Sequence, residues 1–229
     1  MANRYFVPAL PAAGACTLAG EVAHHLARVL RCRPGDRVRL GDGQGGTAEA
    51  VVQTVARDAV HCQVERVDHE PRHRVQLVLA FAVPRLPRLE WILEHGTEVG
   101  VAAFRPLWTA RTRPQGERAE RWQRIVSGAA GQCDRAWLPA VLAAGELTDF
   151  LAACREAPRR FVGAAGAASL RCEPAADGDV VWLVGPEGGF TTDEQAAIHA
   201  AGFAPRSCGA HTLRTETAAV VGAAMLLAP

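Results

Sequence analysis

The sequence contains no lysine, so all 25 of its basic residues are arginines. This excludes a phosphate-binding loop of the GxxxxGK[ST] type, and the GxGxxG dinucleotide fingerprint is missing as well. Neither a GxSxG nor an HExxH motif is present, which disfavours the commonest classes of hydrolase and metalloprotease. The 8 histidines are dispersed, and the one adjacent pair, His24-His25, would point apart on a helix. We therefore expect no metal site.

Paired cysteines and long apolar segments are also lacking. The 7 cysteines are odd in number, scattered and without a CxxC pair, which disfavours a disulfide framework or a zinc site and favours a reducing compartment. The N-terminus has no signal-peptide core. The apolar run Ala218–Ala228 is too short to span a bilayer, and we interpret it as a buried helix. We expect a cytoplasmic protein with no membrane contact.

Charge is nearly balanced overall, with a formal net charge of +1 over 229 residues, but it is unevenly distributed. Five arginines lie within twelve residues, opposed only by Asp36: Arg28, Arg31, Arg33, Arg37 and Arg39. From residue 161 onward, arginines number three and acidic residues seven. This asymmetry fits a phosphate-facing N-terminal module and a C-terminal small-molecule module. A solvated arginine face is the alternative interpretation of the cluster, and charge alone favours it.

Hydrophobic patterning divides the chain at the polar linker His69–His73. Residues 1–70 read as a small β-barrel module with one helix at Glu21–Leu30. Its expected strands are Arg4–Val7, Val38–Leu40, Thr47–Val55 and Val60–Val67. Residues 74–229 alternate between strands and helices, which predicts an α/β domain with a mostly parallel sheet covered on both faces. The expected strands there are Val75–Ala82, Phe104–Trp108, Arg160–Gly163, Val180–Val184 and Phe203–Ser207, and the helices are Leu89–Val99, Glu117–Gly131, Leu147–Cys154, Asp193–Ala201 and Thr215–Leu227.

A glycine-rich loop, Gly185–Gly189, follows the apolar strand Val180–Val184 and precedes a helix. Glycines at the carboxyl end of such a strand let the backbone turn sharply and approach a ligand. Thr192 and Gln195 stand at capping-box spacing for the following helix. An ordinary strand-to-helix turn is the alternative, although it does not account for the proline and carboxylate. The small-residue loop Gly163–Ala168 is a second place where a ligand could approach the backbone, or simply alanine-rich filler.

A second polar motif, Leu213–Thr217, opens the apolar C-terminal segment. Thr215 could cap the last helix, with Glu216 complementing the helix dipole. Capping does not explain Arg214. Together with the glycine loop, this motif suggests the two walls of one pocket.

These two motifs, VGPEGGF at Val184–Phe190 and LRTETA at Leu213–Ala218, resemble the signature of the ribosomal small subunit RNA methyltransferase E family. The resemblance extends over nearly the whole chain, through Arg4–Val7, His25–Asp36, Thr97–Val101 and Gln132–Pro139. The sequence departs from the family pattern at His95, Gly131 and His211, and the Gly163–Ala168 loop lacks an acidic residue often found there.

The resemblance implies a SPOUT-type, trefoil-knotted α/β domain behind a PUA-like β-barrel. It also implies a homodimer that uses S-adenosyl-L-methionine to methylate N3 of a uridine in 16S rRNA within the small ribosomal subunit. This cofactor carries its own electrophile, so neither a metal nor a covalent nucleophile is needed. N3 lies on the Watson–Crick edge and carries a proton, so the base must be unpaired and deprotonated.

The resemblance also suggests roles for particular residues. Arg214 and Glu216 would position or activate uracil, with Glu216 as proton acceptor. Arg4, Arg28 and Arg31 would hold rRNA phosphates. The expected cofactor contacts are Gly163, Val184, Gly185, Pro186, Glu187, Gly188, Gly189, Gly209, Leu213 and Thr215. A SPOUT enzyme that methylates a ribose 2′-hydroxyl and a noncatalytic rRNA-binding protein remain the alternatives.

Overall fold

The computed structural model describes residues 3–112, 118–170 and 177–228. The chain forms two compact units, Met1–Arg72 with Ser127–Leu138 and His73–Val126 with Pro139–Pro229. Our division at 1–70 and 74–229 stays a prediction, and it did not include an internal segment in the first unit. That segment is held to the N-terminal strands by backbone hydrogen bonds from Leu138 N to Gly43 O (3.0 Å) and from Gly45 N to Ala136 O (3.3 Å).

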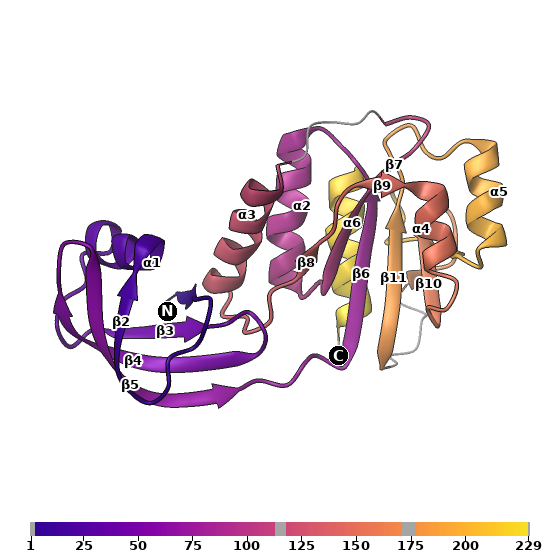
Figure 1. Cartoon of the computed structure of the whole chain (residues 1–229). Helices are drawn as coiled ribbons and strands as arrows, with labels where there is room; N and C mark the ends of the chain where they lie inside the picture. Colours follow the sequence, from indigo (N-terminus) through magenta and orange to yellow (C-terminus); the bar gives the residue numbers. More distant parts are fainter. Residues whose placement is uncertain (1–2, 113–117, 171–176, 229) are drawn as a thin grey trace. The chain divides into compact units, whose positions relative to one another are not determined.

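The first unit is built on a five-stranded sheet of order β1-β3-β4-β5-β2 (Figure 1). The strands are β1 (Arg4–Phe6), β2 (Gly14–Ala19), β3 (Arg37–Gly41), β4 (Gly46–Val55) and β5 (Ala59–His69). All pairings are antiparallel except that of β1 with β3. Alternate residues of β4 and β5, such as Ala50, Val52, Val60 and Cys62, face one buried core. The sequence pattern predicted four of these strands and missed β2, whose small and mixed residues show little β-propensity.

The helix expected at Glu21–Leu30 exists in two parts. A short α1 (Gly20–His24) continues as a π-helical turn, η1 (His25–Val29), and Arg31 then adopts a left-handed φ of 54°. Ala23 and Leu26 are its buried anchors. The apolar spacing therefore predicted a helix here, but it did not predict the change from an α-helix to a π-helical turn.

The second unit contains a seven-stranded sheet of order β12-β10-β11-β6-β7-β8, with β9 also paired to β7. Every pairing in this sheet is parallel. The remaining elements, in chain order, are β6 (Val75–Ala82), α2 (Leu86–Val99), β7 (Ala103–Trp108), α3 (Ala119–Gln132), β8 (Ala140–Val141), β9 (Gly145–Glu146), α4 (Leu147–Ala153), β10 (Arg159–Gly163), β11 (Gly178–Val184), α5 (Thr192–Ala200), β12 (Ala204–Arg206) and α6 (Thr215–Leu227). The part of α3 from Ser127 onward belongs to the first unit. Glu117, the expected start of α3, lies outside the described residues.

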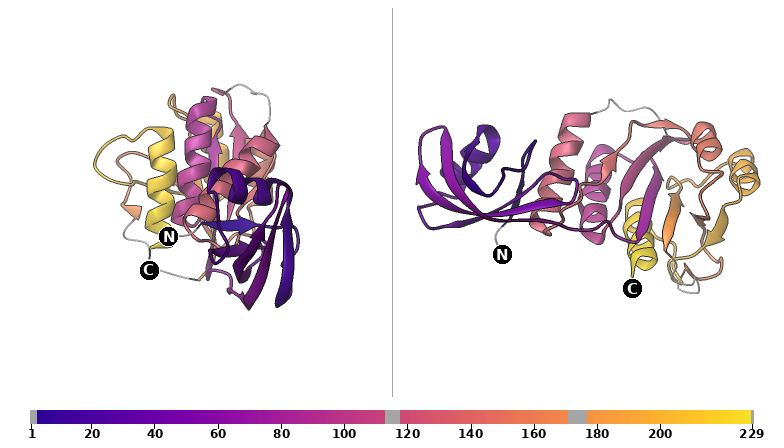
Figure 2. Two further views of the ribbon diagram at one scale, coloured as in Figure 1. Left: turned by 90° about the vertical axis from the view of Figure 1, so that its left-hand side faces the viewer. Right: turned by 60° about the horizontal axis from the view of Figure 1, so that its bottom comes forward.

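Both faces of the parallel sheet are buried, as the alternating strand–helix pattern predicted. Helices α2 and α6 cover one face, and α4 and α5 cover the other (Figures 1 and 2). Along β11, Val180, Trp182 and Val184 join the first core, whereas Val181 and Leu183 join the second. A strand that is buried on both faces consists of consecutive apolar residues, and for this reason the sequence predicted β11.

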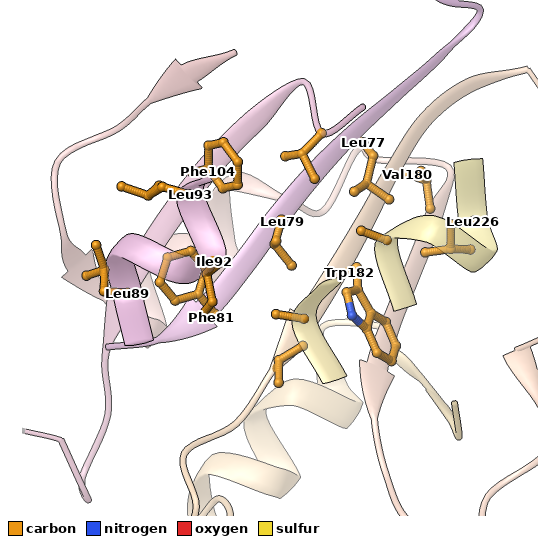
Figure 3. Close-up of a cluster of buried hydrophobic side chains, with 14 of the residues drawn as sticks. Leu77, Leu79, Phe81, Leu89, Ile92, Leu93, Phe104, Val180, Trp182 and Leu226 are labelled. Atoms are coloured by element: carbon orange, nitrogen blue, oxygen red, sulfur yellow. The ribbon is translucent and has the colours of Figure 1, made fainter. Parts of the chain in front are cut away.

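Helix α6 lies directly over Trp182 (Figure 3). A Cβ at Gly222 would come within 2.3 Å of the indole, so only glycine permits this approach. The indole Nε1 donates a hydrogen bond to the Ala218 carbonyl at 3.1 Å. This packing fixes the start of α6, where the second polar motif lies.

The chain reaches α6 by a long return. Strand β12 is at the edge of the sheet beside β10, yet α6 packs against β6, β11 and α2. The chain therefore passes back over β10 and β11 between Arg206 and Thr215. Such a return is a crossing that a knotted domain requires; the trefoil knot itself stays a prediction.

Within the described part of the chain, no helix is both long and apolar enough to cross a membrane. The same residues hold no cluster of three or more potential metal ligands. Six cysteines in the described ranges are free thiols, and Cys172 lies outside those ranges.

Candidate active site

A cavity of about 650 Å³ lies at the carboxyl ends of β10, β11 and β12. The edge formed by these strand ends is where parallel α/β sheets bind small ligands. Apolar side chains of Phe190, Ile198 and Phe203 line it together with main chain from three loops. Both polar motifs and the Gly163–Ala165 loop contribute to its wall. The structure thus brings together the segments that we expected to form one pocket.

The glycine loop requires glycine for two different reasons. Gly189 has a φ of 72°, which L side chains rarely adopt, and its N–H donates to the Pro186 carbonyl at 2.8 Å. A Cβ at Gly185 would instead lie 2.9 Å from the Phe190 ring. Gly185 therefore allows Phe190 to fold back against the loop, and Gly189 allows the turn that returns the chain to α5.

The helix after this loop is capped one residue earlier than the sequence suggested. Thr191 is the N-cap, and its Oγ1 accepts from Glu194 N at 3.3 Å while Glu194 Oε2 accepts from Thr191 N at 2.8 Å. The expected Thr192–Gln195 pair is therefore wrong. Gln195 Nε2 instead donates to the Phe190 carbonyl at 3.0 Å. Both arrangements fix the exit of the glycine loop.

Thr215 joins the two motifs. Its side chain is buried, and Oγ1 donates to the Gly185 carbonyl at 2.9 Å. The N-cap of α6 is Arg214, which makes no side-chain capping bond. Our expectation that Thr215 caps this helix is therefore wrong, because its hydroxyl is committed to the glycine loop thirty residues earlier. The hydrogen bond fixes the distance between the two walls of the cavity.

The two expected catalytic side chains occupy different surroundings. Arg214 is exposed and lines the cavity. Glu216 does not line it, and its side chain is only 12% exposed. Its Oε1 lies 3.5 Å from Nε of Arg88, and its buried Oε2 has no hydrogen-bond partner in the described structure. A buried carboxylate oxygen without a donor calls for one from outside the chain.

Sequence reasoning missed two arginines at this site. Arg88, in the first turn of α2, pairs with Glu187 of the glycine loop as well as with Glu216. Arg111, after β7, donates from Nη1 to the Gly188 carbonyl. Neither belongs to a recognisable motif, because their contacts arise only when β6, β7 and β11 lie side by side. An arginine at the start of α2, where the dipole disfavours cations, was the one available signal.

Nearly all the expected cofactor contacts line the cavity. The exception is Gly188, where an added Cβ would lie 3.0 Å from the Arg111 side chain. The residues that do line it are Gly163, Val184, Gly185, Pro186, Glu187, Gly189, Gly209, Leu213 and Thr215.

In the first unit, the expected phosphate contacts separate into two groups. Arg28 and Arg31 are exposed. Arg4 is buried, with its side chain 6% exposed, and it pairs with Glu70 at 2.9 Å and Asp134 at 3.1 Å. A buried guanidinium that is already paired with two carboxylates is not placed to bind a backbone phosphate. The structure therefore argues against the role expected for Arg4.

Local contacts account for two of the three departures from the family pattern. A Cβ at Gly131 would lie 2.4 Å from the Arg4 carbonyl oxygen, so a larger residue does not fit. His95 stacks on Trp91 with ring centroids 4.2 Å apart. His211 is exposed and lines the cavity, where no contact explains the histidine.

Comparison with known families gives two matches that together span most of the chain. Residues 71–227 match the family described as RNA methyltransferase domain. Residues 18–65 match RNA methyltransferase PUA domain. Each match falls on one of the two sheets described above.

Similar proteins match nearly the whole of this chain and 72% or more of their own length. The protein named ribosomal RNA small subunit methyltransferase E from Synechocystis is 34% identical over 92% of this chain and 72% of its own. Its namesake from Mycobacterium tuberculosis is 34% identical over 96% of this chain and 89% of its own. A solved methyltransferase from Legionella pneumophila, in complex with S-adenosylmethionine, superposes with a TM-score of 0.90 at 28% identity over 100% of this chain and 98% of its own. The methyltransferase E from Neisseria gonorrhoeae, also bound to S-adenosylmethionine, gives 0.89 at 27% identity, over 98% and 96%. With its two sheets, its glycine loop and its Leu213–Ala218 motif, this chain belongs to the ribosomal RNA small subunit methyltransferase E family.

Proposed function

We propose that this protein uses S-adenosyl-L-methionine to methylate N3 of a uridine in 16S rRNA. Membership of an rRNA methyltransferase family supports the reaction class. The observation that carries the proposal is the cavity at the ends of β10, β11 and β12, where both signature motifs meet.

The cavity suits this cofactor in size and lining. About 650 Å³ falls within the range of small-molecule sites. Its glycine backbone at Gly163, Gly185 and Gly189 leaves polar main-chain groups accessible, while Phe190 and Ile198 offer apolar contact for an adenine ring. We therefore assign cofactor binding to the expected contacts that line the cavity, with Gly188 supporting the loop through Arg111.

When bound, the cofactor supplies an electrophilic methyl group. The residues of the chain have to orient the uracil, exclude water and remove the N3 proton. Arg214 extends from the N-cap of α6 at the cavity wall, where its guanidinium can stabilise negative charge that develops on a uracil carbonyl. A neutral N3 is a poor nucleophile, so this stabilisation lowers the barrier to the reaction.

Glu216 is our proposed proton acceptor. Its Oε2 has no donor in the described structure, and the N3–H group of uracil is a suitable one. Glu216 does not line the cofactor cavity and lies beside Arg88, so we propose that uracil reaches it next to Arg88.

We propose that the first unit binds the rRNA. Arg28 and Arg31 are exposed and flank Val29 and Leu30, which are 60% and 54% exposed. Arginines bind backbone phosphates, and exposed apolar side chains between them can contact an unstacked base. We also propose a cytoplasmic homodimer. The partly buried apolar residues Val220, Val221 and Met225 on α6 are consistent with a subunit contact, which light scattering can test.

The decisive experiment is nucleoside mass spectrometry of small-subunit particles lacking this modification after incubation with protein and cofactor. We expect 3-methyluridine at one site in 16S rRNA. A methyl group on the ribose would identify a 2′-O-methyltransferase instead. Binding of rRNA without any methylation would identify a noncatalytic protein.

A further inference from the structure

The guanidinium of Arg88 contacts one carboxylate from each signature motif. Its Nη1 pairs with Oε1 of Glu187 in the glycine loop, and its Nε lies 3.5 Å from Oε1 of Glu216 in α6. The two carboxylates are 29 positions apart in the chain, and neither pairs with any other described cation. A single side chain from α2 thus links the cofactor wall to the proposed proton acceptor.

The three side chains differ in exposure in a way that matters for this link. Glu187 is 53% exposed, Arg88 36% and Glu216 12%. The ion pair therefore runs from the open rim of the cavity to a nearly buried carboxylate. Solvent and salt screen the exposed Arg88–Glu187 contact. The Arg88–Glu216 contact pairs a nearly buried carboxylate that would be costly to leave unpaired.

We propose that Arg88 is a positioning residue that couples cofactor binding to the placement of Glu216. The inference rests on the proposed function. Cofactor that contacts the glycine loop orders Glu187, which fixes Arg88 and thereby holds Glu216 with Oε2 free for uracil. Because coupling between sites is reciprocal, uridine bound at Glu216 strengthens cofactor binding by the same factor.

The chemistry of arginine suits this role better than that of lysine. Its planar guanidinium presents donors along two edges and can contact two carboxylates in fixed directions. A lysine ammonium offers one point charge and would favour one partner over the other. Arg88→Lys should therefore retain charge but lose the coupling.

Helix α2 offers a matched control. Glu90, two residues after Arg88, pairs with Arg121 through two hydrogen bonds, one of 2.7 Å, and pairs with no residue of either motif. The Arg121 side chain also holds the pKa of Glu90 below its usual value. Removing Arg121, which lies on α3, deletes an ion pair made by α2 without disturbing the link between the motifs.

The first experiment measures cofactor affinity by calorimetry. Arg88→Ala should weaken cofactor binding by about fivefold or more, the lower range of typical coupling between sites. Arg121→Ala should leave the affinity unchanged. In a Glu187→Gln background, Arg88→Ala should cause no further loss of affinity, because its partner in the cofactor loop is already gone.

The second experiment measures turnover at saturating cofactor and rRNA. Arg88→Ala should lower kcat by about tenfold or more, since a small misplacement of a reacting group is costly, while KM for rRNA stays the same. This loss should be smaller in the Glu187→Gln background, where Arg88 is no longer fixed by the glycine loop, and should disappear in the Glu216→Gln background. A merely structural arginine would lower kcat by the same factor in the parent and in both backgrounds.

The outcomes distinguish this inference from the proposed function. If the parent protein makes 3-methyluridine but Arg88→Ala behaves like Arg121→Ala, the coupling is refuted and the function stands. If the parent protein makes none, the function fails, and the calorimetric cycle with Glu187 still decides whether Arg88 supports the cofactor loop. Purely additive effects of Arg88→Ala and Glu187→Gln on affinity would also overturn the coupling.

Discussion

The two proposed binding regions are built in opposite ways. The cavity of the second unit is lined by apolar side chains and by loops whose path is fixed by Gly185, Gly189 and the Thr215 hydrogen bond. The surface of the first unit is formed by exposed side chains, with Arg28 and Arg31 on either side of two apolar residues. Ligand affinity in the cavity depends on individual residues that fix the path of the loops. Affinity at a charged surface is instead the sum of several similar contacts. Single substitutions should therefore have large effects in the cavity and graded ones on the surface.

The largest expected effect concerns Arg214. Replacing it with alanine removes the one guanidinium that lines the cavity wall from the second motif. We expect kcat to fall by about a hundredfold or more, as the loss of a preorganised charge-stabilising donor typically causes. Cofactor affinity should change much less. Single-turnover assays and calorimetry on the same preparation test this split, and normal methylation by Arg214→Ala would refute its role.

The next largest effect concerns the turn of the glycine loop. Gly189→Val places a β-branched residue at a φ of 72° on the cavity wall, so we expect at least about a tenfold loss of cofactor affinity. Gly178 is a matched control, because its φ is 100°, its surroundings are open and it is remote from the cavity lining. Gly178→Val should lower the melting temperature similarly without weakening cofactor binding. Equal losses of affinity in the two variants would mean that backbone strain alone is responsible.

The sequence predicted those elements that a local pattern of residues reveals. Parallel strands such as β6 and β11 were predicted because burial on both faces leaves a continuous apolar run. The two motifs were predicted because dense glycines and charges beside such a strand have few structural explanations. Strand β2 was missed because its register is set by pairing with β5, not by its own residues.

Long-range contacts explain the remaining errors at the sites. We expected Arg4 to bind rRNA phosphates at the surface. It is instead buried and donates to Asp134, which is 130 residues away in the sequence. Arg88 and the true partner of Thr215 were missed for the same reason, since both contacts span distant parts of the chain. Local patterns determine which residues form each loop, whereas the fold determines which loops meet.

An intermediate effect is expected from the hydrogen bond that joins the cavity walls. Thr215→Val keeps the shape of the buried side chain but leaves the Gly185 carbonyl without this donor, which should cost about 1–3 kcal/mol in the free energy of unfolding. Thr97→Val is the control, because Thr97 is equally buried and donates to Leu93 O at 2.7 Å away from the cavity. Both variants should lose stability in urea, Thr97→Val less because the Leu93 carbonyl keeps its helical N–H donor, whereas only Thr215→Val should also weaken cofactor binding. Unchanged cofactor affinity in Thr215→Val would show that the cavity keeps its shape without this bond.

The smallest effect is expected on the arginine surface, and it should depend on salt. Replacing Arg28 and Arg31 together by glutamine keeps side-chain length and removes two positive charges. Each lost phosphate contact should reduce the salt slope of single-stranded rRNA binding by about 0.7, giving a change of roughly 1.4 for the pair. Arg57→Gln is the control, because Arg57 is also exposed but lies in the turn between β4 and β5. Filter binding between low and moderate salt would measure the slopes, and cofactor affinity should stay constant throughout. If the double variant and the control keep the parent slope, then Arg28 and Arg31 form a solvated face and the rRNA is held elsewhere.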